Sequence, residues 1–265
     1  MAVVKDFYDF IDQIAPFATQ EGFDNAGFLA GRGDRPVERV LVALDITEAV
    51  VSEAADWGAQ LIVAHHPVIF QPVKSVTDES VVGRVLLALT ENRIAAICAH
   101  TNLDAAHGGV NGCLARALEL TDIGQLCQAG VDEKGRPYGI GRTGTVHRPG
   151  MSAAEYAAFV KEKLGSASVR FVDGGKPVQM VAVGGGSCGS MMEDALAQGC
   201  DTFVTADLKY NNFLDAQALG LNLLDAGHFP TENVVCAPLV SRLAKAFPQV
   251  EVRVSQVHRE VYSNV

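Results

Sequence analysis

The chain has 265 residues, of which 48% are hydrophobic and 20% are charged, and its formal net charge is −10. This composition is typical of a folded globular protein and excludes a largely disordered or collagen-like chain. The excess of acidic side chains also argues against a general nucleic-acid-binding surface, because affinity for the phosphate backbone comes mainly from Lys and Arg.

The cysteines and the first residues indicate the compartment. Six cysteines are scattered along the chain without a C-x-x-C pair, which indicates reduced thiols rather than disulfides or a zinc knuckle. The N-terminus runs directly into an amphipathic pattern with Asp6 and Asp9 on it, unlike a secretory signal, and no apolar run reaches the ~18 residues that span a membrane. We therefore expect a cytoplasmic protein without a membrane partner.

Short apolar runs alternate with helical patterns along the chain, which predicts an α/β fold with sheets buried on both faces. The expected helices lie near 5–14, 48–57, 79–91, 110–119, 152–164, 189–198 and 233–246. The expected strands are 40–44, 61–64, 94–99, 169–172, 180–183, 202–205, 221–224 and 250–254.

Glycine and proline concentrate at 121–150, a stretch with loop-like composition that we take as a domain junction. The expected domains are residues 1–125 together with 226–265, and residues 126–225. Two stretches, 43–65 and 183–207, also resemble each other, since each reads strand, loop, helix, glycine and strand. They are either a diverged duplication or two ordinary βαβ units.

Polar side chains that can bind metals follow three of the predicted strands. His65 and His66 come directly after 61–64 and are followed by a proline that stiffens the turn. Asp104 follows 94–99, and, read locally, fits better as a turn or helix-capping residue. His228 and Glu232 follow 221–224, where Glu232 also suits the first turn of a helix.

Together these five residues form a mixed nitrogen and oxygen ligand set. Such a set selects Zn²⁺, Fe²⁺, Mn²⁺ or Ni²⁺ over Cu⁺ and suits Ca²⁺ poorly. Five ligands are too many for one catalytic zinc and just enough for two divalent metal ions bridged by a carboxylate, here Glu232. The alternative is that each residue has only a structural role.

A glycine-rich loop separates 180–183 from the next helical pattern. Backbone N–H groups at Gly185, Gly186 and Ser187 could bind a phosphate or carboxylate, whereas the structural alternative is a tightly packed turn. The spacing of Gly184, Gly186 and Gly189 also matches G-x-G-x-x-G, a weak signal for a dinucleotide site. Asp207, at the end of the following strand, forms either a surface pair with Lys209 or part of an acid–base pair.

In combination, these motifs resemble the dinuclear-metal family often named GTP cyclohydrolase 1 type 2, also called the NGG-interacting-factor-three-like family. The resemblance covers nearly the whole chain and rests on ordered motifs, which are Asp24-Asn25-Ala26-Gly27-Phe28-Leu29-Ala30-Gly31, His65-His66-Pro67-Val68-Ile69-Phe70 with Pro72 and Lys74, His100-Thr101-Asn102-Leu103-Asp104 with Gly108-Gly109, the glycine loop, and Asp225-Ala226-Gly227-His228 with Glu232.

The resemblance implies two α/β domains with the metals in the cleft between them, in a ring-shaped homohexamer. It implies the short form of the family, without an inserted domain, and transfers the ligand roles to His65, His66, Asp104, His228 and Glu232. This chain departs from the family at Tyr210-Asn211, where members often carry a histidine after the T-G-D motif.

The expected function is metal-dependent hydrolysis of a nucleotide or related heterocycle by a metal-activated hydroxide, at C8 of guanine if the family name applies. Asp207 or His100 would move protons, and Lys74 or the glycine loop would hold phosphates. One alternative is a metal-binding ring that acts as a scaffold or regulatory protein without turnover. Another is a nicotinamide oxidoreductase, which leaves the histidines unexplained.

Overall fold

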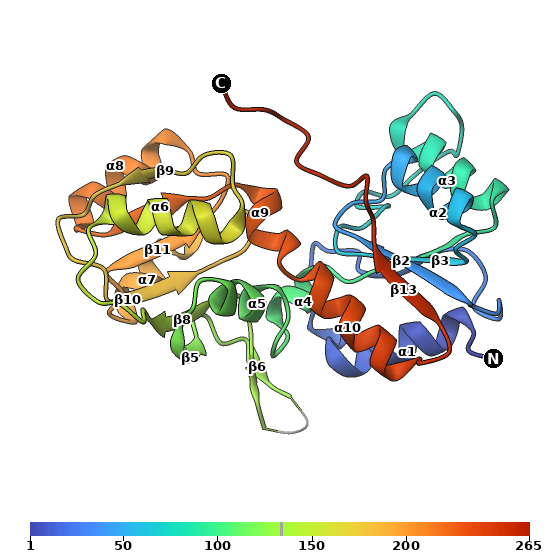
Figure 1. The fold of residues 1–265 in the computed structure, drawn as a ribbon, viewed down its shortest axis with the longest axis horizontal. Helices are drawn as coiled ribbons and strands as arrows, with labels where there is room; N and C mark the ends of the chain where they lie inside the picture. Colours follow the sequence, from blue (N-terminus) through green and yellow to red (C-terminus); the bar gives the residue numbers. More distant parts are fainter. Residues whose placement is uncertain (133–134) are drawn as a thin grey trace. The chain divides into compact units, whose positions relative to one another are not determined.

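The computed structural model describes residues 1–132 and 135–265. They form two compact units (Figure 1). Unit 1 consists of Met1–Leu103 and Cys236–Arg259, and unit 2 consists of Asp104–Val235 and Glu260–Val265. Both are α/β units, as the sequence predicted.

The unit boundary lies at residue 103/104 and not near residue 125. Residues 104–125, 226–235 and 260–265, which we assigned to the first domain, belong to unit 2. The reason is that β5 (Thr121–Gln125) pairs with β8 (Arg142–Thr145), and that Leu114 and Leu118 are buried in the core of that sheet.

Unit 1 is built on a five-stranded sheet in the order β1-β4-β3-β2-β13. Strands β13, β2, β3 and β4 are parallel, and β1 is antiparallel to β4 at one edge. The elements are α1 (Val4–Ile14), η1 (Phe17–Thr19), β1 (Gly27–Ala30), β2 (Arg39–Ala43), α2 (Glu48–Trp57), β3 (Leu61–Ala64), α3 (Val81–Glu91), β4 (Ala95–Cys98), α10 (Cys236–Ala246) and β13 (Glu251–Val254). Helix α4 (Thr101–Ala105) contains the boundary between the units.

Helices cover both faces of this sheet, with α2 and α3 on one side and α1 and α10 on the other (Figure 1). The central strands β3 and β4 are buried throughout because each face packs against helices, which explains their uninterrupted apolar sequences. Thr47 caps α2 by accepting a hydrogen bond from the Val50 N–H, and Gly58 ends it at a φ of +72°.

Unit 2 is built on a six-stranded mixed sheet in the order β5-β8-β10-β11-β12-β9. Its three central strands are parallel, while β8, β9 and β5 pair in the antiparallel sense. The remaining elements are α5 (Val110–Ala117), β6 (Gly130–Val131), β7 (Pro137–Tyr138), α6 (Ala153–Leu164), β9 (Arg170–Val172), β10 (Met180–Val183), η2 (Gly189–Met191), α7 (Met192–Ala197), β11 (Thr202–Thr205), α8 (Tyr210–Leu219), β12 (Asn222–Asp225) and α9 (His228–Asn233).

The core of unit 2 has one layer on each face of the sheet. Helices α5 and α6 pack on one face through residues such as Leu114 and Tyr156. Helices α7 and α8 pack on the other face through residues such as Met192 and Ala216.

All eight predicted strands are present with small shifts at their ends. The repeated strand–helix–strand pattern corresponds to β2-α2-β3 and β10-α7-β11.

The stretch 121–150, expected to be a loop-like junction, instead contains strands β5 to β8. Its composition misled the prediction because glycines occupy crowded or left-handed positions within and between these strands. A Cβ at Gly144 would lie 2.8 Å from the backbone oxygen of Thr121 on the paired strand, and Gly141 has a φ of +77°. None of the described helices combines the length and apolarity required to cross a lipid bilayer.

The buried side chain of Arg142 connects the segment before β8 to the end of α4. Its guanidinium is buried and donates hydrogen bonds of 2.7–3.2 Å to the carbonyls of Gly139, Gly141, Ala105 and Ala106. Burial lowers its pKa to about 10, so the side chain remains charged at neutral pH. Arg142 therefore fixes the end of α4 against the entry to β8.

We expect Arg142→Met to destabilise the protein by about 3 kcal/mol, because it leaves buried carbonyl oxygens without donors. Urea denaturation followed by circular dichroism measures this. The control is Arg116→Met, which removes an exposed guanidinium hydrogen-bonded to Cys113. Equal stability of the two variants would contradict the role assigned to Arg142.

Candidate metal centre

Unit 1 gathers three histidines at one edge of its sheet. His65 and His66 follow β3, and His100 lies two residues after β4. These strands are parallel neighbours with Ala64 opposite Cys98, so the chain leaves both at the same sheet edge. One ring nitrogen from each histidine lies within 4.8 Å of the others, and the ring centroids are 5.0–5.5 Å apart.

Each of the three imidazoles is oriented by a hydrogen bond at Nδ1. His65 Nδ1 donates to the Ala99 carbonyl oxygen at 2.8 Å, His66 Nδ1 contacts Asp45 Oδ1 at 2.7 Å, and His100 Nδ1 contacts Asp24 Oδ1 at 2.8 Å. An oxygen partner at Nδ1 fixes the ring and makes Nε2 the coordinating atom, as in histidine ligands generally.

Asp24 is the most strongly held of these oxygen partners. Its carboxylate also accepts hydrogen bonds from the backbone N–H and hydroxyl of Thr101. Burial alone would raise the pKa of Asp24, but the hydrogen bonds from His100 and Thr101 outweigh burial and lower it to about 2. The ionised carboxylate is thus the stable form at every pH at which His100 could act.

Unit 2 carries a second group of ligand-type side chains, on and before α9. His228 and Glu232 are one helical turn apart, with His228 Nε2 3.0 Å from Glu232 Oε2. The other ring nitrogen, Nδ1, lies 2.7 Å from Asp207 Oδ2. Burial alone would lower the pKa of His228, but the two carboxylates outweigh it and raise this pKa to about 9.

Asp104 lies close to Glu232 within the same unit. A carboxylate oxygen of each is within 4.8 Å of the other, and both residues are buried. Burial raises the pKa of the neighbouring Cys188 thiol, and the negative charges of Asp104 and Glu232 raise it further. The buried carboxylates of Asp104 and Glu232 repel each other, and the His228 imidazole beside Glu232 offsets part of that repulsion.

The glycine loop packs directly against this acidic group. Gly185 N–H donates to Asn111 Oδ1 at 2.8 Å and Gly186 N–H donates to Thr231 Oγ1 at 3.1 Å. A Cβ at Gly186, whose φ is +65°, would lie 2.1 Å from Glu232 Oε1. These glycines therefore make room for the Glu232 carboxylate, a role that the sequence did not indicate, and their binding of a substrate anion remains a prediction.

The other predicted site residues are placed differently. Asp207 adopts a left-handed backbone with a φ of +54° and orients His228, while Lys74 and Ser187 are exposed on loops. His100, predicted only to move protons, belongs geometrically to the imidazole cluster. Asn211 is exposed near the start of α8.

Sequence reasoning did not assign roles to Asp24 and Asp45, which orient two of the imidazoles. Asp45 lies two residues after β2, the strand next to β3, so the strand-end rule that identified the histidines could have identified it. Asp24 lies in a loop far from His100 in sequence, and no local signal connects the two.

The donors fit divalent transition metals. Unit 1 offers three oriented imidazoles, and unit 2 offers one imidazole and two buried carboxylates. No thiolate belongs to these groups in the described part of the chain, which matches the preference of Zn²⁺, Fe²⁺, Mn²⁺ and Ni²⁺ for mixed nitrogen and oxygen ligands.

We expect Asp24→Asn to lower stability by about 1 to 2 kcal/mol at pH 7, because it removes a carboxylate whose folded-state pKa is depressed. The wild-type advantage is complete above the unfolded pKa near 4 and is lost as the pH falls through about 2. Urea denaturation of both proteins between pH 7 and pH 2 measures it. Asp9→Asn on the exposed face of α1 is the control, and a pH-independent gap would contradict the assignment.

We expect Gly186→Ala to displace the Glu232 carboxylate and reduce bound transition metal by more than half. Gly165→Ala is the matched control, because Gly165 has a φ of +64° with open space around its Cβ position. Both variants bear the strain of a left-handed alanine, about 1 kcal/mol, and only the first meets Glu232. Metal content by mass spectrometry distinguishes them, and equal metal loss in both would contradict the steric explanation.

Comparisons with known proteins identify the family. The family model described as Duf34/NIF3 (NGG1p interacting factor 3) matches residues 2–261. A Clostridium perfringens protein named GTP cyclohydrolase 1 type 2 homolog is 34% identical over 86% of each chain, and a Helicobacter pylori protein named GTP cyclohydrolase 1 type 2 is 32% identical over 88% of each. A crystal structure of a Staphylococcus aureus hypothetical protein superposes with a TM-score of 0.92, at 31% identity and 99% coverage of both chains. The chain therefore belongs to the Duf34/NIF3 family, whose curated members carry the name GTP cyclohydrolase 1 type 2 or its homolog.

Proposed function

We propose that the protein is a hydrolase that depends on two divalent transition-metal ions and acts on a nucleotide or related heterocycle. The observation that carries the proposal is the pair of buried carboxylates, Asp104 and Glu232, with the His228 imidazole on Glu232. A protein retains such a pair at a cost in stability, which a bound cation offsets.

The proposed ligands, which would hold the two ions, are His65, His66, Asp104, His228 and Glu232. The hydrogen bonds to His65 Nδ1, His66 Nδ1 and His228 Nδ1 support this assignment, because each holds a ring in a fixed orientation. Zn²⁺, Fe²⁺, Mn²⁺ and Ni²⁺ all suit these donors. When bound, such ions supply Lewis-acid activation of water near neutral pH.

The chain's own residues would bind and protonate the substrate. His100, paired with the ionised Asp24, can accept a proton and stabilise it in the resulting ion pair. The exposed Lys74 ammonium can pair with substrate phosphates, and Ser187 can donate a hydrogen bond from the glycine loop. Asp207 holds His228 and so acts on the reaction by positioning this ligand.

GTP is the first substrate to test, because a Helicobacter pylori relative bears the name GTP cyclohydrolase 1 type 2. The corresponding reaction is addition of water at C8 of guanine, which opens the imidazole ring. The resemblance of the motifs also leads us to propose a homohexamer, whose mass sedimentation velocity would measure.

The second candidate function is a metal-binding scaffold without turnover. Asn211 favours it, because family members often carry a histidine here, and an exposed amide cannot replace a histidine in proton transfer. The two functions make the same prediction for metal content and opposite predictions for catalysis.

The decisive experiment measures metal content and GTP consumption together, on untagged protein purified without chelator. We expect close to two transition-metal ions per chain in the wild type. Glu232→Gln keeps the side-chain shape but removes a charge, and we expect it to lose most of the metal and at least 100-fold of any activity. Glu251→Gln, on the exposed part of β13, is the matched control and should behave as wild type.

Each outcome separates the hypotheses. Two ions with GTP turnover that falls in Asp207→Asn supports the hydrolase. Two ions without turnover of GTP or other nucleotides supports the scaffold. A wild-type protein without metal after reconstitution, or a Glu232→Gln variant with full metal content, would contradict the ligand assignment.

A further inference from the structure

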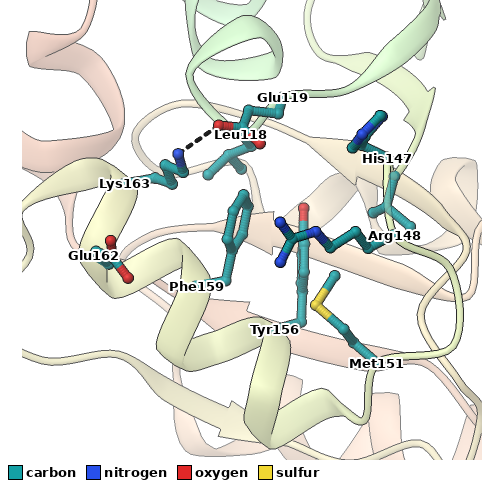
Figure 2. A pocket seen from close by; sticks show the side chains of 10 residues that line it. Leu118, Glu119, His147, Arg148, Met151, Tyr156, Phe159, Glu162 and Lys163 are labelled. Carbon is teal, nitrogen blue, oxygen red and sulfur yellow. Dashed lines mark hydrogen bonds and ion pairs between the residues drawn. The ribbon is translucent and has the colours of Figure 1, made fainter.

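Unit 2 contains a cavity of about 290 Å³ between helix α6 and the segment 146–151 (Figure 2). None of the proposed metal ligands lines it. Its volume lies near the lower end of the range for small-molecule sites, which suits a ligand the size of one substituted ring. The cavity therefore needs an explanation separate from the metal centre.

Apolar side chains line one side of the cavity. The rings of Tyr156 and Phe159, both on α6, have centroids 5.7 Å apart and planes within 22° of parallel. Met151 and Val146 extend this apolar surface. Aromatic rings and a methionine thioether offer their greatest contact area to a planar apolar body.

One polar atom on this side of the cavity has no partner. Tyr156 is fully buried, and its hydroxyl makes no hydrogen bond within the described residues. Burial raises the pKa of this phenol, so the hydroxyl keeps its proton and is available as a donor. A buried hydroxyl without an acceptor is costly, whereas a phenylalanine would fill the same space without that cost.

The cavity lining includes two basic side chains, Lys163 and Arg148. Lys163 is engaged by Glu119 and lies 5.4 Å from the centroid of the Phe159 ring. Arg148 is exposed and makes no ion pair among the side chains that the structure describes. Figure 2 shows the guanidinium of Arg148 well separated from Glu162, the acidic group at the other end of the cavity. Arg148 is therefore the cation available to an incoming acid group.

We propose that this cavity binds a small organic anion with a flat apolar body, which packs on Phe159 and Met151 while its acid group is held by Arg148 and the Tyr156 hydroxyl. The acid group replaces the acceptor that the hydroxyl lacks. A carboxylate and a phosphate monoester share the required chemistry.

The test is isothermal titration calorimetry with four probes on the full chain. Benzoate and phenyl phosphate carry the proposed combination and distinguish a carboxylate from a phosphate. Benzyl alcohol lacks the charge and inorganic phosphate lacks the apolar body. We expect saturable binding of benzoate or phenyl phosphate, at least tenfold tighter than binding of either control probe. Equal binding of inorganic phosphate, or no saturable binding of the aromatic acids up to about 10 mM, would overturn the proposal.

Two variants test the assigned groups. We expect Tyr156→Phe to weaken binding of the aromatic acid about tenfold while the melting temperature of the free protein stays the same or rises. Arg148→Gln should weaken binding at least tenfold, and Lys161→Gln, which removes a positive charge from α6 outside the cavity, should not change it. Unchanged affinity in either of the first two variants would overturn the assignment.

The proposal is independent of the metal centre, and one further titration shows this. Binding of the aromatic acid should be unchanged in Glu232→Gln, because Glu232 does not line the cavity. Loss of binding in that variant, with the protein still folded, would place the ligand at the metal centre instead and would contradict the proposal.

Discussion

The whole arrangement of candidate ligands depends on the register between neighbouring parallel strands. Ala64 lies opposite Cys98 in unit 1, and Thr205 lies opposite Asp225 in unit 2. Parallel strands end at the same sheet edge, so residues that follow them in sequence emerge close together. A shift of one residue would point every strand side chain to the opposite face, and the fully apolar cores on both faces oppose that shift. Hydrophobic packing thus fixes the place where the polar chemistry occurs.

Sequence patterns predicted the strands well for the same reason. β3, β10 and β11 have the predicted bounds, because short runs rich in apolar and β-branched residues favour buried strands. Helix α8 was missed because its exposed face and low amphipathicity left no clear period, and β5 to β8 were missed because their glycines read as turns. Local sequence patterns do not show which residues far apart in the chain come into contact. The pairing of Asp24 with His100 and the position of Gly186 beside Glu232 are two such contacts.

The candidate metal centre is supported by the hydrogen-bond partners of its histidines. Histidine residues alone are weak evidence for a metal, since most are structural. The structure adds an oxygen partner at Nδ1 for His65, His66, His100 and His228, and three of these partners are carboxylates. Negative charge at Nδ1 increases the electron density available at the coordinating nitrogen. Asp207 holds its position beside His228 with a left-handed backbone.

The interleaving of the two units along the chain has a consequence for synthesis. Strand β13, which completes the sheet of unit 1 beside β2, follows nearly all of unit 2 in the chain. Nearly all of unit 2 is made before β13 emerges, so unit 2 can fold while unit 1 still has an open edge at β2. During that interval an apolar strand lacks its neighbour and can pair with other chains. A chain truncated before β13 would keep that edge of the sheet exposed permanently. Such a chain would aggregate although it still contains every proposed metal ligand.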